Sequence, residues 1–215
     1  LLKDPSRYLG SQSVALVTNQ TGVTLSLEPA LDAFHECAEI NLVAAFGPEH
    51  GVRGDVQDAL GVESSVDAYT GVTVHSLYGD HLKPTPKALE GVDALVFDIQ
   101  DCGARFYTYV STLTYCMEAA QENGLSLVVL DRPNPVNGLA VEGNILEPGY
   151  ASFIGLHPVP IRHGLTLGEL ALFINRGVGC DLAVVEMRGW CRGMWYDETG
   201  LPWVQPSPNL PTLDT

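Results

Sequence analysis

Short apolar runs rich in β-branched residues alternate along this chain with longer segments whose apolar residues recur at helical spacing. Runs of this length are typical of strands that are buried on both faces of a sheet. The strand pattern predicts strands at residues 13–18, 40–46, 72–77, 92–99, 125–130 and 181–186. The helical pattern predicts helices at residues 28–38, 107–123 and about 166–175.

Two of the predicted helices carry recognisable end signals. Gly124 follows the helix predicted at 107–123, and glycine readily adopts the left-handed conformation that closes a helix. Thr166 and Glu169 have the spacing of a capping box, in which each residue satisfies a backbone N–H of the other. We therefore expect one helix to end at residue 124 and another to begin at residue 166.

The alternation of strands and helices predicts the fold class and the domain layout. It favours an α/β fold with an open, mostly parallel, Rossmann-like sheet and helices on both faces, since a closed barrel would need eight such units. Residues 1–200 are expected to form this domain. Residues 201–215 contain four prolines, at positions 202, 206, 208 and 211, and are expected to be a linker that leads out of it.

Composition and charge narrow the possible partners. The 215 residues are 46% hydrophobic and 17% charged, as in an ordinary globular protein. Eleven Lys and Arg stand against 26 Asp and Glu, giving a net charge of −15, so nucleic acid and anionic membrane surfaces are not expected partners. No apolar stretch approaches the ~20 residues of a membrane span. The five cysteines form no CxxC pair and predict neither a zinc site nor a disulfide framework.

Polar residues gather where four of the predicted strands end. In an open parallel sheet, ligands bind beyond the carboxyl ends of the strands. Glycines and prolines accompany these polar residues and restrict the backbone there. The segments concerned are residues 18–22, 47–54, 98–109 and 131–135.

Glu49 is the first candidate for acid–base chemistry. It lies between Pro48 and His50 at the end of the second predicted strand. A general acid needs a carboxyl group whose pKa is raised by partial burial or by a neighbouring carboxylate. The alternative is that Glu49 is structural and pairs with Arg53.

The segment after the fourth predicted strand offers further candidates. Asp98 and Asp101 are three residues apart, and the alternative for either is that it binds loop N–H groups. Gln100 and Arg105 are suitable hydrogen-bond donors to a sugar hydroxyl, an amide or a carboxylate. Tyr107 and Tyr109 have the rings to stack on a sugar, although at least one is expected to be core.

Known cofactor motifs are missing from the sequence. It contains no HExxH or HxH metal motif, no glycine-rich phosphate-binding turn and no GxSxG nucleophile elbow, so no metal or cofactor is predicted. Arg162 and His163 precede the last predicted helix and can present cations to an anionic ligand. The alternative for Arg162 is a buried pair with a strand-end aspartate.

Five blocks, in order, resemble the NamZ-like exo-β-N-acetylmuramidases of bacteria. They are Gly47-Pro48-Glu49-His50-Gly51 with Arg53-Gly54, residues 97–109, Leu130-Asp131-Arg132-Pro133-Asn134-Pro135, residues 160–166 and Pro206-Ser207-Pro208-Asn209-Leu210-Pro211. The resemblance extends over essentially the whole chain. It implies a glycoside hydrolase that releases N-acetylmuramic acid (MurNAc) from the non-reducing ends of peptidoglycan fragments. It also implies a Rossmann-like N-terminal domain, a smaller C-terminal domain that this chain is expected to lack, and a location in the cell envelope, with a cytoplasmic one left open.

The resemblance also assigns roles to residues. Glu49 is implied as general acid/base, and Asp98 or Asp101 as the second group, either reacting directly or orienting the 2-acetamido group of the sugar. The lactyl carboxylate of the substrate needs a cation, for which Arg105, Arg132, Arg162 and His163 are candidates. The other implied substrate contacts are His50, Arg53, Gln100, Tyr107 and Asn134.

Two other functions remain open at this point. The first is a non-catalytic module that binds peptidoglycan fragments and leaves the sugar intact. The second is a metal-dependent hydrolase of another bond, using His50 with Asp98 or Asp101.

Overall fold

A computed structural model describes residues 1–54 and 64–213. Their centre is a sheet in which neighbouring strands are parallel, except for the antiparallel pair β3–β4. The strand order is β3-β4-β2-β1-β5-β6-β7. The strands are β1 (Ser13–Thr18), β2 (Asn41–Gly47), β3 (Ser64–Val66), β4 (Thr73–Ser76), β5 (Ala94–Asp98), β6 (Ser126–Leu130) and β7 (Asp181–Val185).

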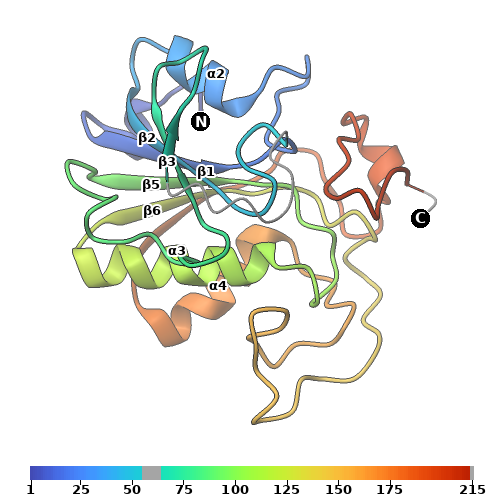
Figure 1. Cartoon of the computed structure of the whole chain (residues 1–215). Helices are drawn as coiled ribbons and strands as arrows, with labels where there is room; N and C mark the ends of the chain where they lie inside the picture. The colour runs from blue at the N-terminus through green and yellow to red at the C-terminus, as the bar shows by residue number, and fades with distance from the viewer. Residues whose placement is uncertain (55–63, 214–215) are drawn as a thin grey trace.

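Helices cover both faces of the sheet (Figure 1). One face carries α2 (Ala30–Glu36), with the short α1 (Ser6–Leu9) beside it; the other carries α3 (Tyr109–Asn123) and α4 (Leu167–Val178). A 3-10 helix, η1 (Tyr196–Thr199), follows near the end of the chain. The predicted α/β, Rossmann-like class is confirmed.

Two hydrophobic cores arise because successive side chains of a strand point to opposite faces. In β5, Leu95 and Phe97 pack on the α3–α4 side, whereas Ala94 and Val96 pack on the α2 side. All five residues of β5 are buried. This explains why the strand appears in the sequence as a continuous apolar run.

The two predicted helix ends are confirmed. Gly124 closes α3 with a φ of 67°, and its N–H donates to carbonyls of the last turn. Thr166 caps α4, and its hydroxyl and the Glu169 carboxylate each accept a backbone N–H of the other residue. Asp131, at the end of β6, adds a cap that the sequence analysis did not identify, since it accepts the Gly168 N–H at 2.7 Å.

The six predicted strands are present, with ends shifted by up to two residues. The edge strand β3 was missed because its three residues are all exposed and have no hydrophobic pattern. The short α1 and η1 were missed as well. No helix or strand forms over residues 200–213.

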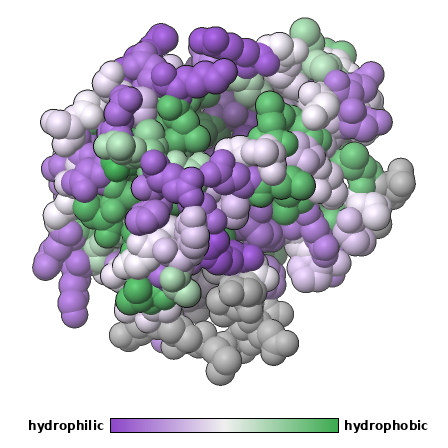
Figure 2. Space-filling view, turned by 90° about the horizontal axis from the view of Figure 1, so that it is seen from above, coloured by the Kyte–Doolittle hydropathy of each residue, from purple (hydrophilic) through white to green (hydrophobic). Residues whose placement is uncertain are grey.

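The surface is mixed in character. Hydrophilic and hydrophobic side chains are interspersed over the face that lies uppermost in Figure 1, as Figure 2 shows. In the described ranges, no helix is both long and apolar enough to cross a bilayer. All five cysteines are free.

Candidate active site

A tight turn after β2 presents Glu49. The Gly51 N–H donates to the Pro48 carbonyl at 2.9 Å, and His50 adopts a left-handed φ of 73°. Gly47 precedes this turn, and a Cβ there would lie 2.8 Å from the backbone nitrogen of Val52. Because only glycine avoids that clash, the sequence of this block fixes the path of the backbone at Glu49.

The Glu49 carboxylate has no hydrogen bond or ion pair with any other residue that the structure describes, and it is half-buried. The alternative that Glu49 pairs with Arg53 is wrong. Arg53 instead binds Asp67 through two nitrogens, at 2.6 and 2.9 Å, and Asp32 at 2.7 Å. Glu49 therefore has a carboxylate that is positioned by the backbone and available to a ligand.

Arg53 connects the turn after β2 to two other parts of the fold. Asp32 lies on α2, and Asp67 directly follows β3. The hydrogen bonds from Arg53 hold the pKa of Asp67 far below its usual range, although burial opposes this. The guanidinium predicted to contact substrate is thus occupied by two carboxylates.

Asp98, at the end of β5, forms a two-point ion pair with Arg132, which follows β6. Arg132 Nε lies 2.6 Å from Asp98 Oδ1, and Nη2 lies 3.0 Å from Oδ2. Arg132 also donates to the Val23 carbonyl at 3.1 Å, so the pair joins the ends of β5 and β6 to the loop that follows β1. Burial lowers the pKa of Arg132, but the adjacent Asp98 outweighs this and raises it.

A hollow of about 430 Å³ lies beside the Asp98–Arg132 pair. Its walls also include Trp190, Met194 and Arg188. Both members of the pair line this hollow while remaining bonded to each other.

Hydrogen bonds link the segments that flank the crevice between β1 and β5. Without β3, the strand order is that of a Rossmann fold, which binds ligands at this point of reversal. Here the Thr18 hydroxyl donates to the Asp98 carbonyl at 2.8 Å, and the Gln100 N–H donates to the Thr21 hydroxyl at 2.9 Å. A side chain at Gly22 would overlap Thr18.

Asp101 and His163 form a buried pair behind the loop that follows β5. His163 Nε2 lies 3.7 Å from Asp101 Oδ2, which accepts the Gly103 N–H at 2.9 Å. His163 Nδ1 accepts the Leu165 N–H, so in the neutral ring the proton is on Nε2 and faces Asp101. Burial raises the pKa of Asp101 and lowers that of His163.

Gln100 and Asn134 tie neighbouring loops together. Gln100 Nε2 donates to the carbonyls of Asp101 and Pro133, at 2.8 and 2.7 Å. Asn134 Nδ2 donates to the Leu165 carbonyl at 2.8 Å. Gln100 Oε1 is buried without a partner in the described structure.

Arg105 and Arg162 hold the long segment between β6 and α4. Arg105 donates to the carbonyls of Asn144 and Val159, at 2.7 and 2.6 Å. Arg162 pairs with Glu142, donates to the Val136 carbonyl and lies over the Trp195 ring at 5.3 Å. The alternative that Arg162 pairs with a strand-end aspartate is therefore wrong.

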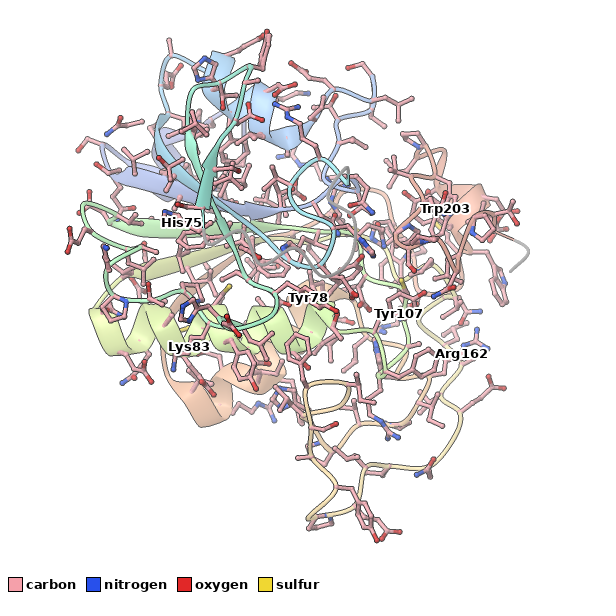
Figure 3. The ribbon with its side chains drawn as sticks, viewed as in Figure 1. His75, Tyr78, Lys83, Tyr107, Arg162 and Trp203 are labelled. Atoms are coloured by element: carbon pink, nitrogen blue, oxygen red, sulfur yellow. The ribbon has the colours of Figure 1, made fainter. Side chains whose placement is uncertain are left out.

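Tyr107 and Tyr109 contact the end of the chain. The buried Tyr109 hydroxyl donates to the Pro206 carbonyl at 2.5 Å. Burial raises the pKa of Tyr107, and a hydrogen bond with Ser207 partly offsets this. Figure 3 shows Tyr107 and Trp203 at the same edge of the sheet, whereas Lys83 lies toward the other end of α3.

The structure thus brings together some of the predicted residues and separates others. Asp98 meets Arg132, and Asp101 meets His163. Within the described ranges, no hydrogen bond or ion pair joins Glu49 to either aspartate, and no three His, Cys, Asp or Glu residues are placed to hold a metal ion. Ser207 was not identified as a site residue, because only the fold places it at this edge, and Gln20, although it lies in the polar segment 18–22, was not singled out because its partners lie 185 and 186 residues away.

Known proteins resemble the chain over its whole length. A protein of Bacillus subtilis named peptidoglycan beta-N-acetylmuramidase NamZ is 53% identical over 217 residues, which cover 100% of this chain and 52% of the relative. Crystal structures of two DUF1343 family proteins from Bacteroides fragilis match 99% of the chain. The first is 47% identical with a TM-score of 0.91, and the match covers 54% of its chain. The second is 37% identical with a TM-score of 0.83, and the match covers 57% of its chain.

The chain spans about half the length of these relatives. The family model described as exo-beta-N-acetylmuramidase NamZ, N-terminal, matches residues 14–214. The chain therefore belongs to the NamZ family and corresponds to its N-terminal part.

Proposed function

We propose that this chain is the N-terminal part of an exo-acting glycoside hydrolase that releases MurNAc from the non-reducing end of peptidoglycan fragments. The observation that carries the proposal is the 53% identity, over the whole chain, to a protein named as a peptidoglycan beta-N-acetylmuramidase. We further propose that residues 201–215 lead into a second domain, which is supported by the relative's greater length. Peptidoglycan fragments of this kind occur in the bacterial cell envelope.

Glu49 is the proposed general acid/base. Its turn is fixed by Gly47 and Gly51, which supports the accurate placement that proton transfer requires. Its half-buried carboxylate has no other partner in the described structure, unlike those of Asp98 and Asp67. A second domain closing over this edge would bury Glu49 further and exclude water from the proton transfer.

Asp98 and Asp101 are proposed as positioning residues. Asp98 is neutralised by Arg132, and Asp101 lies buried behind the Cys102–Gly103 loop. Neither arrangement leaves a carboxylate exposed to attack a sugar. The 2-acetamido oxygen of the substrate then serves as the nucleophile, as in other substrate-assisted glycosidases, while Glu49 protonates the leaving oxygen.

The test uses the full-length protein and the disaccharide MurNAc-GlcNAc, with products identified by mass spectrometry. Glu49→Gln keeps the shape of the side chain and removes its acid, so release of MurNAc is expected to fall at least 100-fold. The matched control is Glu147→Gln, which makes the same change at an exposed position and is expected to leave the rate unchanged.

Three results would contradict the proposal. Intact disaccharide after incubation with the wild-type protein favours the binding module over the hydrolase. Release of MurNAc by Glu49→Gln at a rate within tenfold of wild type removes Glu49 from the acid/base role. Activity that disappears on exhaustive chelation favours the metal-dependent alternative.

A further inference from the structure

The last part of the described chain returns to the carboxyl edge of the sheet. Residues 203–210, which we name the returning segment, form no helix or strand. Their backbone nevertheless accepts hydrogen bonds from residues that lie far away in the sequence. In Figure 1 this part of the chain lies at the same end of the sheet as the turn after β2.

Gln20 connects the returning segment to the turn that carries Glu49. Its Nε2 donates to the carbonyls of Gln205 and Pro206, at 3.1 and 3.2 Å. On its other side, the Cβ and Cγ of Gln20 lie about 3 Å from where a side chain at Gly54 would begin. The two segments are therefore separated by the thickness of one side chain.

Two further anchors fix the returning segment. Tyr109 donates to the Pro206 carbonyl, and Leu210 packs against the core on the α3–α4 side. Between these anchors the chain turns tightly, since the Leu210 N–H donates to the Ser207 carbonyl and the Asn209 N–H to the Ser207 hydroxyl. Prolines 206 and 208 restrict this turn before any ligand binds.

Asn209 projects from this turn. The residue is exposed, and its side chain makes no hydrogen bond within residues 1–54 and 64–213. An amide offers both a donor and an acceptor, as a sugar hydroxyl or an acetamido group requires. A fixed turn with an exposed polar side chain, linked through Gln20 to the segment that carries Glu49, is suited to form a binding-site wall.

We propose that the turn at Ser207–Asn209 forms one wall of the MurNAc site, with Asn209 contacting the sugar and Tyr109 positioning the turn. This inference rests on the proposed function and adds to it. The segment that the sequence presents as a linker is then part of the binding site. The ligand class is an N-acetylated sugar with a carboxylate.

The test measures two quantities in the full-length protein: the Kd for free MurNAc by calorimetry, and kcat and KM with MurNAc-GlcNAc. Asn209→Ala is expected to raise Kd and KM together by about five- to tenfold, the loss of one or two hydrogen bonds, with kcat within about twofold. Tyr109→Phe is expected to raise KM and to lower Tm. Asn41→Ala, an exposed amide at the opposite edge of the sheet, is the control and should change neither Kd, KM nor kcat.

The two measurements separate this inference from the proposed function. If the wild type hydrolyses the disaccharide but Asn209→Ala binds MurNAc within twofold of wild type, the proposed role of the Ser207–Asn209 turn is wrong and the proposed hydrolase function is retained. If the wild type binds MurNAc without hydrolysing the disaccharide, and Asn209→Ala weakens binding, the proposed hydrolase function is wrong and the proposed role of the turn in binding is retained. Absence of both binding and hydrolysis overturns both.

Discussion

Arg132 holds Asp98 through two hydrogen bonds, 2.6 and 3.0 Å long, across the ends of β6 and β5. Their side chains are only 15% and 5% exposed, so the charges are compensated by each other rather than by water. The sequence offered both residues as parts of the catalytic or binding machinery. In the fold, each residue compensates the charge of the other, and the pair fixes the edge of the sheet on which the candidate site lies.

Removing one member of this pair should destabilise the fold strongly. Arg132→Met leaves a buried, uncompensated carboxylate and is expected to lower the free energy of unfolding by about 3–5 kcal/mol. The measurement is equilibrium unfolding in urea. The matched control is Lys83→Met, which removes a more exposed pair with Glu118 and Glu122 and should cost less than about 1 kcal/mol. Equal losses in the two variants would contradict this account of Asp98.

Asp67 should make stability depend on pH in the acid range. Its pKa is lowered in the folded state by Arg53, so the folded protein holds the carboxylate ionised more strongly than the unfolded chain does. This contribution is present above about pH 4 and is lost as the pH falls further, toward the folded pKa. Asp67→Asn should therefore destabilise the protein at pH 7, and the difference from wild type should shrink below pH 4. A difference that stays constant from pH 7 to pH 3 would assign the effect to packing.

Gly47 should not tolerate a side chain. A Cβ there would approach the backbone of Gly51 and Val52 to within 2.9 Å, so Gly47→Ala must displace the turn that carries Glu49. We expect a loss of stability and a loss of activity of at least tenfold, measured by thermal unfolding and by MurNAc release. Gly177→Ala is the control, because that glycine lies within α4 with open space around its Cβ position. It should raise stability by about 0.4–1 kcal/mol and leave activity unchanged.

The stereochemistry of the released sugar tests the role of the acetamido group. Attack by the acetamido oxygen, followed by water, gives net retention, so the first-formed product should be the β-anomer. Proton NMR during the first minutes of the reaction distinguishes the anomers before they equilibrate. First-formed α-anomer would instead require a second carboxylate acting as base and would return Asp98 or Asp101 to the reaction.

Several features of the site followed from local sequence alone. The glycines around Glu49, the capping box at Thr166 and the apolar run of β5 each reflect constraints that act within a few residues. Such constraints are visible in one sequence because the residues that satisfy them are neighbours in the chain. The candidate acid was found in this way.

The ion-pair and hydrogen-bond partners of these side chains could not be predicted in the same way. Arg53 was as close in sequence to Glu49 as any cation, yet it binds Asp32 and Asp67, which the strand order brings next to it. Likewise, nothing local marks Gln20 or Tyr109 as anchors for residues 203–210. Contacts between residues 97 to 186 positions apart depend on how the sheet is ordered.

The sequence by itself determined the α/β class, the edge of the sheet where polar residues gather, and Glu49 as the group to test. Hydrophobic periodicity and backbone restriction are local properties, and they decided these points. Only the tertiary structure decided which charges are already paired, as Asp98 is with Arg132, and which segment closes the edge. Pairing and closure depend on distances between strand ends, which are set when the sheet forms and its helices pack on both faces.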